Sequence, residues 1–168
     1  MTQQMQIAYI LLTASTFAVL NRPAIGQNIT VREMVVQQAI AALATNDQAA
    51  LEKLSIDQDE FKKYLWPTMA AQASSNMTAA KYFAIYQKTS HVGISEAVTA
   101  LGGRKWEVIK VSFGPPQRKG SGYQLFAAPD ITLRDGTQEK TMRLVGGVLE
   151  HDGTGKVTNY YVSPTLKK

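Results

Sequence analysis

Few side chains in this sequence have the types and spacing that catalysis or metal binding requires. The two histidines, His91 and His151, are far apart in the chain, and neither has neighbours in a metal-ligand pattern. No Gly-x-Ser-x-Gly segment offers a serine nucleophile, and no phosphate-binding loop of the Walker type occurs. The absence of cysteine excludes thiolate chemistry, disulfides and cysteine-based metal sites. The sequence therefore predicts no catalytic residue, no metal site and no cofactor.

The contexts of the two histidines indicate other roles for them. His151 precedes Asp152 in a predicted hairpin turn, which favours a solvated side chain. His91 is predicted to end a helix, where its cationic form would complement the helix dipole.

The charge of the chain is modest and its basic residues are scattered. The formal net charge is +5, from 18 Lys and Arg against 13 Asp and Glu. Basic pairs such as Arg118-Lys119 are short, and acidic residues are mixed among them. Nucleic-acid-binding proteins gather such residues on one stripe, so this pattern predicts solvated surface and no nucleic-acid partner.

The first 26 residues differ in composition from the rest. Ile7 to Leu20 form an uncharged run of 14 residues, which is too short to cross a hydrocarbon core of about 30 Å as a helix. The run matches the apolar region of a signal peptide, and Ala24-x-Gly26 supplies small residues for cleavage, although MTQQMQ has no Lys or Arg. We therefore expect a signal peptide at 1–26, cleaved before Gln27, and a periplasmic or secreted mature form that does not span the membrane. A retained N-terminal anchor helix is the alternative.

The first half of the mature chain has the signals of several helices. Thr30-Val-Arg-Glu33 and Asp57-Gln-Asp-Glu60 are capping-box patterns, and Asn46-Asp47 separates two apolar helical repeats. Pro67 is predicted to end a short helix over FKKYLW, because the residue before proline avoids helical geometry. Two further helices are expected over residues 77–88 and 94–101.

The second half, Arg104 to Val162, has the signals of antiparallel strands. Asp135-Gly136 predicts a tight hairpin, Asp152-Gly153-Thr-Gly155 predicts another, and Gly146-Gly147 predicts a bulge that bends a long strand. About four strands against N-terminal helices make residues 27–168 a single α+β domain with a bent sheet.

Three segments carry a resemblance to a known family: AIAALATNDQAALEKL (39–54), the helix stop at Trp66-Pro67, and RLVGGVLEHDGTGKVTNYYV (143–162). With helices first and long bent strands after them, the mature chain resembles the nuclear transport factor 2-like superfamily. This is the cone-shaped α+β fold shared with ketosteroid isomerases and SnoaL-like cyclases. The resemblance implies a pocket between helices and sheet, and it leaves the chemistry open, because one fold hosts many functions.

The isomerase-type relatives place an Asp base and a Tyr or acidic oxyanion donor inside the cone. Tyr64 and Tyr82 are donor candidates, whereas Asp130 follows Pro129 and is typical of a turn or edge residue. No position of this chain matches the catalytic pair, so no catalytic residue is carried over from these relatives.

The candidate pocket residues are aromatic, with one arginine. The helical aromatic residues either fill the core or line a cavity between the helices and the sheet, and at least one is expected to line it. Arg143 would bind a carboxylate if its strand face points inward. The opposite face carries Met142, Leu144 and Val148 and is the better core candidate, which favours an outward Arg143. The candidate ligand-binding residues are Tyr64, Trp66, Tyr82, Tyr86 and Arg143.

Three functional hypotheses follow from these observations. The first is an exported, non-catalytic pocket domain that binds a small apolar or amphipathic molecule or a partner protein. The second is an isomerase- or cyclase-type enzyme, which requires a buried Asp or Glu without a partner and with a strongly raised pKa. The third is an interaction module that forms a homodimer through the open face of its sheet.

Overall fold

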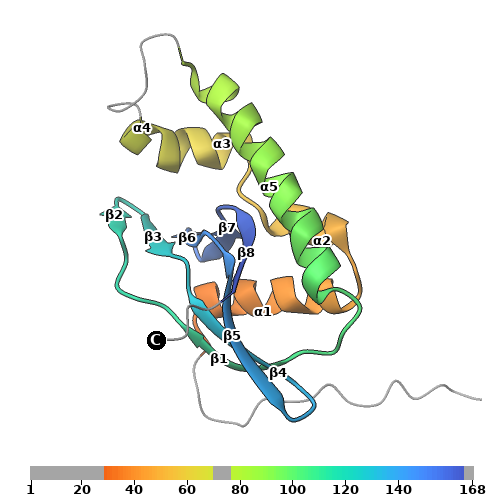
Figure 1. The fold of residues 1–168 in the computed structure, drawn as a ribbon. Helices are drawn as coiled ribbons and strands as arrows, with labels where there is room; N and C mark the ends of the chain where they lie inside the picture. Colours follow the sequence, from red (N-terminus) through yellow and green to blue (C-terminus); the bar gives the residue numbers. More distant parts are fainter. Residues whose placement is uncertain (1–28, 70–76, 165–168) are drawn as a thin grey trace, which may run out of the picture.

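The computed structural model describes residues 29–69 and 77–164 and has an α+β architecture (Figure 1). The predicted signal peptide lies outside the described residues. The helical elements are α1 (Val31–Ala44), α2 (Gln48–Leu54), α3 (Gln58–Glu60), the π-helical η1 (Phe61–Leu65), α4 (Trp66–Met69) and α5 (Ala79–Leu101). The strands are β1 (Glu107–Ser112), β2 (Arg118–Gly120), β3 (Tyr123–Ala127), β4 (Asp130–Asp135), β5 (Gln138–Val145), β6 (Gly147–His151), β7 (Thr154–Val157) and β8 (Tyr160–Pro164).

The strands form two four-stranded antiparallel sheets, in the orders β1-β4-β5-β8 and β2-β3-β6-β7. The sequence predicted about four strands, and the structure divides the last three of these segments between the two sheets, at Ala128-Pro129, at Gly146 and at Thr158-Asn159. The first segment forms β1 alone, and β2 is an additional strand after it. At Gly146 an added Cβ would lie 1.9 Å from Oδ1 of Asn159, so a larger residue cannot take this position without a shift. The sequence predicted a bulge within one long strand at Gly146-Gly147; the structure has a break there, with β5 ending at Val145 and β6 beginning at Gly147 in the other sheet.

Local sequence signals set most of the element boundaries. Thr30 and Glu33 form the predicted capping box of α1, and Asp57 and Glu60 form that of α3. Asp47 caps α2 by accepting a hydrogen bond from the backbone N–H of Ala50. The β4–β5 hairpin pairs Asp135 with Gln138, and the β6–β7 hairpin turns through Asp152 and Gly153, both with positive φ.

The prediction that Pro67 ends its helix was wrong. The chain stays helical from Gln58 to Met69, with a π-helical turn at η1 and a new α-helical start at Trp66. Pro67 directly follows η1, in whose π-helical pattern the backbone N–H of Trp66 donates to the Phe61 carbonyl. The helix therefore departs from regular α-helical hydrogen bonding just before the proline.

The prediction of two separate helices before and after residue 90 was also wrong, because α5 is continuous from Ala79 to Leu101. Gly93 lies inside it at the place where α5 crosses β8. A Cβ added to Gly93 would lie 1.9 Å from the backbone oxygen of Tyr160. His91 is therefore not at a helix end; it is an exposed mid-helix residue, 3.9 Å from Glu52.

Two hydrophobic clusters hold the elements together. The larger one packs α1, α2 and the second half of α5 against β4, β5 and β8, and it includes the predicted core residues Met142, Leu144 and Val148. The smaller one is centred on Phe61 and joins η1 and the first half of α5 to Leu149 of β6. Among residues 29–69 and 77–164, no helix is both long and apolar enough to cross a membrane.

Candidate ligand-binding cavity

The predicted pocket aromatics gather around one phenylalanine. Phe61 is fully buried, and its ring lies 6.4 Å from that of Trp66, 6.0 Å from Tyr82 and 5.3 Å from Tyr86, measured between centroids. Trp66 and Tyr82 are partly exposed and also contact each other. Most of this aromatic surface therefore packs against itself.

Tyr64 belongs to the same hydrophobic cluster, but its ring contacts are with residues of the sheet. Its ring packs 5.1 Å from Tyr123 and 4.8 Å from His151, and its hydroxyl donates to Asp152 at 3.3 Å. Tyr64 is buried, so it joins η1 to the β6–β7 hairpin.

Arg143 points outward. Its side chain is exposed, and its Nε donates to Asp130 Oδ1 at 2.9 Å across the β4–β5 pair. The hydrogen bond and the charge of Asp130 raise the pKa of Arg143. The structure does not bring Arg143 together with the four aromatic candidates.

A cavity of about 270 Å³ lies between α5 and the segment from α2 to α3. Its apolar wall is formed by Ile56 and Phe83, and Tyr86 and Thr158 close one side. The polar lining comes from both segments and consists of Glu52, Ser55, Asp57, Gln58, Gln87, Ser90 and His91. This volume is close to the lower end of the range for small-molecule sites.

A second cavity, of about 240 Å³, shares Tyr86 and Thr158 with the first. It extends toward η1 and α4 on one side and toward Gly146-Gly147 on the other. The Tyr86 hydroxyl donates a hydrogen bond to the Thr158 carbonyl. This contact forms a common wall between the two cavities at the point where the chain passes from β7 to β8.

Ser90 is the buried polar group of the first cavity that has no partner among the described residues. Its residue is only 4% exposed, and its hydroxyl makes no hydrogen bond to any described residue. Thr158, the other buried polar residue, donates its hydroxyl to the Gly147 carbonyl. A buried hydroxyl without a partner costs about 1–3 kcal/mol. Ser90 is therefore a group that a ligand or an ordered water would satisfy.

The rim of the first cavity carries more negative than positive charge. Glu52 and Asp57 are exposed carboxylates, and the ring of His91 lies 3.9 Å from Glu52. No lysine or arginine lines this cavity. The rim therefore disfavours anions and accommodates neutral or cationic molecules.

The prediction of a solvated His151 was wrong. Its side chain is only 12% exposed, with Nε2 2.9 Å from Glu60 Oε1 and Nδ1 3.4 Å from Asp152 Oδ2. The hairpin-turn pattern predicted exposure of this side chain to water, but η1 and α3 cover this end of β6. His151 connects these helices to the sheet and lies outside the first cavity.

The carboxylate that an isomerase-type mechanism requires has no counterpart in the described chain. Every Asp and Glu in residues 29–69 and 77–164 is at least partly exposed. The partly buried Glu60 and Glu150 are paired with His151 and Arg32. No group of three or more His, Asp or Glu side chains among these residues is arranged to hold a metal ion.

Comparison of the chain with family models, with curated proteins and with solved structures gave no match.

Of the five predicted ligand-binding residues, Tyr86 alone lines the first cavity. Sequence reasoning missed Ser90, Gln87 and Thr158. Ser90 follows Phe83 and Tyr86 at the spacing of one helix face, so a polar residue at an apolar position was the available signal. The predicted helix break near residue 90 concealed it.

Alkaline pH is expected to destabilise the protein through two buried tyrosines. Burial raises the pKa of Tyr86 and of Tyr160 above the ordinary value of 10.0. A pKa that is higher in the folded state gives stability that is complete below about pH 10 and is lost as pH rises toward the folded pKa. Urea unfolding between about pH 9 and pH 11 should show this loss, and Tyr160→Phe should make it less steep. An unchanged slope in Tyr160→Phe would contradict the assignment.

Proposed function

We propose that this chain is an exported, non-catalytic pocket domain that binds a small amphipathic molecule in the cavity beside Ser90. The observation that carries this proposal is the buried Ser90 hydroxyl, which has no partner among the described residues and lines a cavity of about 270 Å³. Tyr86 and Phe83 offer aromatic surface next to it. This combination of apolar walls and one unsatisfied polar group is typical of a ligand site.

The lining defines the chemistry of the proposed ligand. Its apolar body would pack against Phe83 and Ile56, and one polar group would exchange a hydrogen bond with Ser90. The carboxylates of Glu52 and Asp57 favour a neutral or cationic molecule over an anion. The ligand class is therefore a small aromatic or aliphatic alcohol, amide or amine.

Membership of the nuclear transport factor 2-like superfamily is part of the same proposal. It is supported by helices that precede long antiparallel strands, by the break of these strands at Gly146, and by a cavity beside this break. A cone-shaped member would keep its ligand between the helices and the sheet, where Tyr86 and Thr158 lie.

The test is a titration of the protein with p-cresol and, separately, with toluene. The NMR chemical shifts of the backbone amides are measured at each step. We expect both probes to shift the amides around Phe83 to His91, with p-cresol binding roughly 3–10-fold more tightly because one hydrogen bond contributes about 0.5–1.5 kcal/mol. In Ser90→Ala this preference should disappear, while the unliganded variant unfolds at the same or a higher temperature.

Ser95→Ala is the matched control, because Ser95 is exposed on the outer face of the same helix. It should leave the preference for p-cresol unchanged. Shifts that fall outside the cavity residues, or none with either probe, would reject the site. A preference that persists in Ser90→Ala would reject the role of this hydroxyl.

A further inference from the structure

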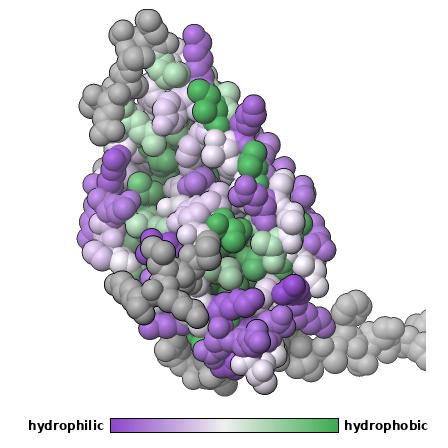
Figure 2. Space-filling view, in the orientation of Figure 1, coloured by the Kyte–Doolittle hydropathy of each residue, from purple (hydrophilic) through white to green (hydrophobic). Residues whose placement is uncertain are grey.

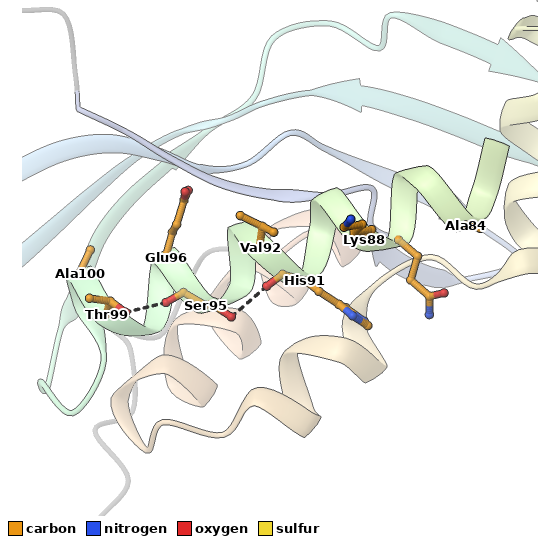
Figure 3. Close-up of a pocket in the computed structure, with 9 residues that line it drawn as sticks. Ala84, Lys88, His91, Val92, Ser95, Glu96, Thr99 and Ala100 are labelled. Atoms are coloured by element: carbon orange, nitrogen blue, oxygen red, sulfur yellow. Dashed lines mark hydrogen bonds between the residues drawn. The ribbon is translucent and has the colours of Figure 1, made fainter. Parts of the chain in front are cut away.

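The outer face of α5 is a broad shallow hollow that no described element covers. Nine exposed residues of this one helix line it: Ala84, Gln87, Lys88, His91, Val92, Ser95, Glu96, Thr99 and Ala100 (Figure 3). Val92 is 53% exposed at its centre, and Ile85, about two helical turns before it, is 59% exposed. Figure 2 shows hydrophobic residues alternating with hydrophilic ones along this side of the molecule. The face is therefore neither a charged solvent face nor a closed pocket.

The residues at every fourth position of this face are arranged symmetrically about Val92. Going outward from Val92, Lys88 and Glu96 come first on the two sides, and Ala84 and Ala100 come next. Residues spaced by four form one ridge of a helix. When two such ridges run in opposite directions, Lys88 of one lies opposite Glu96 of the other, and Ala84 of one lies opposite Ala100 of the other.

The two charges of the ridge have no ion-pair partner within the described part of the chain. Lys88 and Glu96 take part in none of the hydrogen bonds or ion pairs found there, unlike most charged residues of the sheet hairpins. They are eight residues apart, which is about 12 Å along a helix, so they do not neutralise each other. Each charge is therefore available to a partner that carries the opposite sign at the matching place.

We propose that a second copy of this chain docks on this face, α5 against α5 and antiparallel, with the two-fold axis at Val92. The axis puts Val92 against Val92 of the second copy and each Lys88 opposite Glu96 of the other copy. Ala84, Ser95, Thr99 and Ala100 are small side chains of this face, and they let two helices approach to about 8–10 Å. A parallel pair would oppose like charges, and a chemically different partner would have no reason to match the symmetry.

The expected dimer is weak, because one helix pair buries less than the roughly 800 Å² per partner of a standard interface. Charge variants test it by sedimentation velocity over a range of protein concentrations. Lys88→Glu and Glu96→Lys should each weaken self-association at least about 5-fold, because each puts like charges opposite each other. An equimolar mixture of these two variants should form heterodimers, and the double variant should regain the wild-type constant.

Cysteine cross-linking fixes the direction of the pair, since the chain has no native cysteine. Val92→Cys is expected to form an intermolecular disulfide on mild oxidation, because its Cα atoms meet at the axis within the reach of about 7 Å that a disulfide needs. Thr99→Cys is the control: it lies on the same face but seven residues from the axis, so it should not cross-link.

A protein that stays monomeric at all concentrations would overturn the proposal. So would cross-linking of both cysteine variants, which would indicate a parallel pair. Dimers that the two charge variants leave unchanged would place the interface elsewhere, such as on the sheet. None of the altered residues lines the Ser90 cavity, so experiments on the unliganded protein test the dimer whether or not that cavity binds a ligand.

Discussion

Gly93→Ala is expected to destabilise the protein by about 3 kcal/mol, although alanine is the better helix former. A Cβ on Gly93 would lie 1.9 Å from the backbone oxygen of Tyr160 and 2.5 Å from its carbonyl carbon. Backbone cannot rotate out of the way as a side chain can, so α5 and β8 would have to separate. Overpacking of this kind typically costs about 1–3 kcal/mol or more, which exceeds the gain of about 1 kcal/mol in helix propensity.

Urea unfolding of two glycine variants checks this result. Gly114→Ala is the control, because an added Cβ there meets nothing within 4 Å; it should unfold at the wild-type urea concentration or slightly above it. If Gly93→Ala were as stable as the wild type, the close crossing of α5 over β8 would be incorrect.

Phe61→Ala is expected to cost about 3–5 kcal/mol, the usual range for removing a fully buried aromatic ring. Phe61 is completely buried, and its ring contacts those of Trp66, Tyr82, Phe83 and Tyr86. Four rings would lose their common neighbour, and two of them belong to the proposed cavity. The change therefore tests whether η1 and α5 depend on one side chain for their contact.

Met34→Ala is the control for this truncation, because Met34 is an exposed α1 residue and alanine favours a helix. Its midpoint of thermal unfolding should stay within a few degrees of the wild type, whereas Phe61→Ala should lower the midpoint by roughly 10 °C. Equal midpoints for the two variants would show that the aromatic cluster contributes little to stability.

Local chemistry explains which parts of the fold were predictable. The capping boxes at Thr30 and Asp57 and the hairpins at Gly136 and Gly153 each depend on a few neighbouring residues, so their patterns identify them directly. The class α+β follows from the order of these elements. The confirmed core of β5 and β6 follows from alternation along the strand.

The errors arose where distant contacts decide the outcome. A glycine inside a helix predicts a break, but Gly93 is present because a strand crosses there. His151 was predicted in water because the sequence cannot indicate that Glu60 lies beside it. Ser90 was missed for the same reason, since its lack of a hydrogen-bond partner is a property of the packed molecule.

Two residues, Gln87 and His91, line both the outer hollow of α5 and the cavity beside Ser90. Their shared position would link the proposed self-association to the proposed ligand binding, if a bound ligand changes how these two side chains lie. If a ligand changes the dissociation constant of the α5 pair by some factor, formation of the pair changes the affinity for that ligand by the same factor, because the coupling free energy is reciprocal. A ligand that holds these side chains toward the cavity would therefore change the monomer–dimer ratio without moving the sheet.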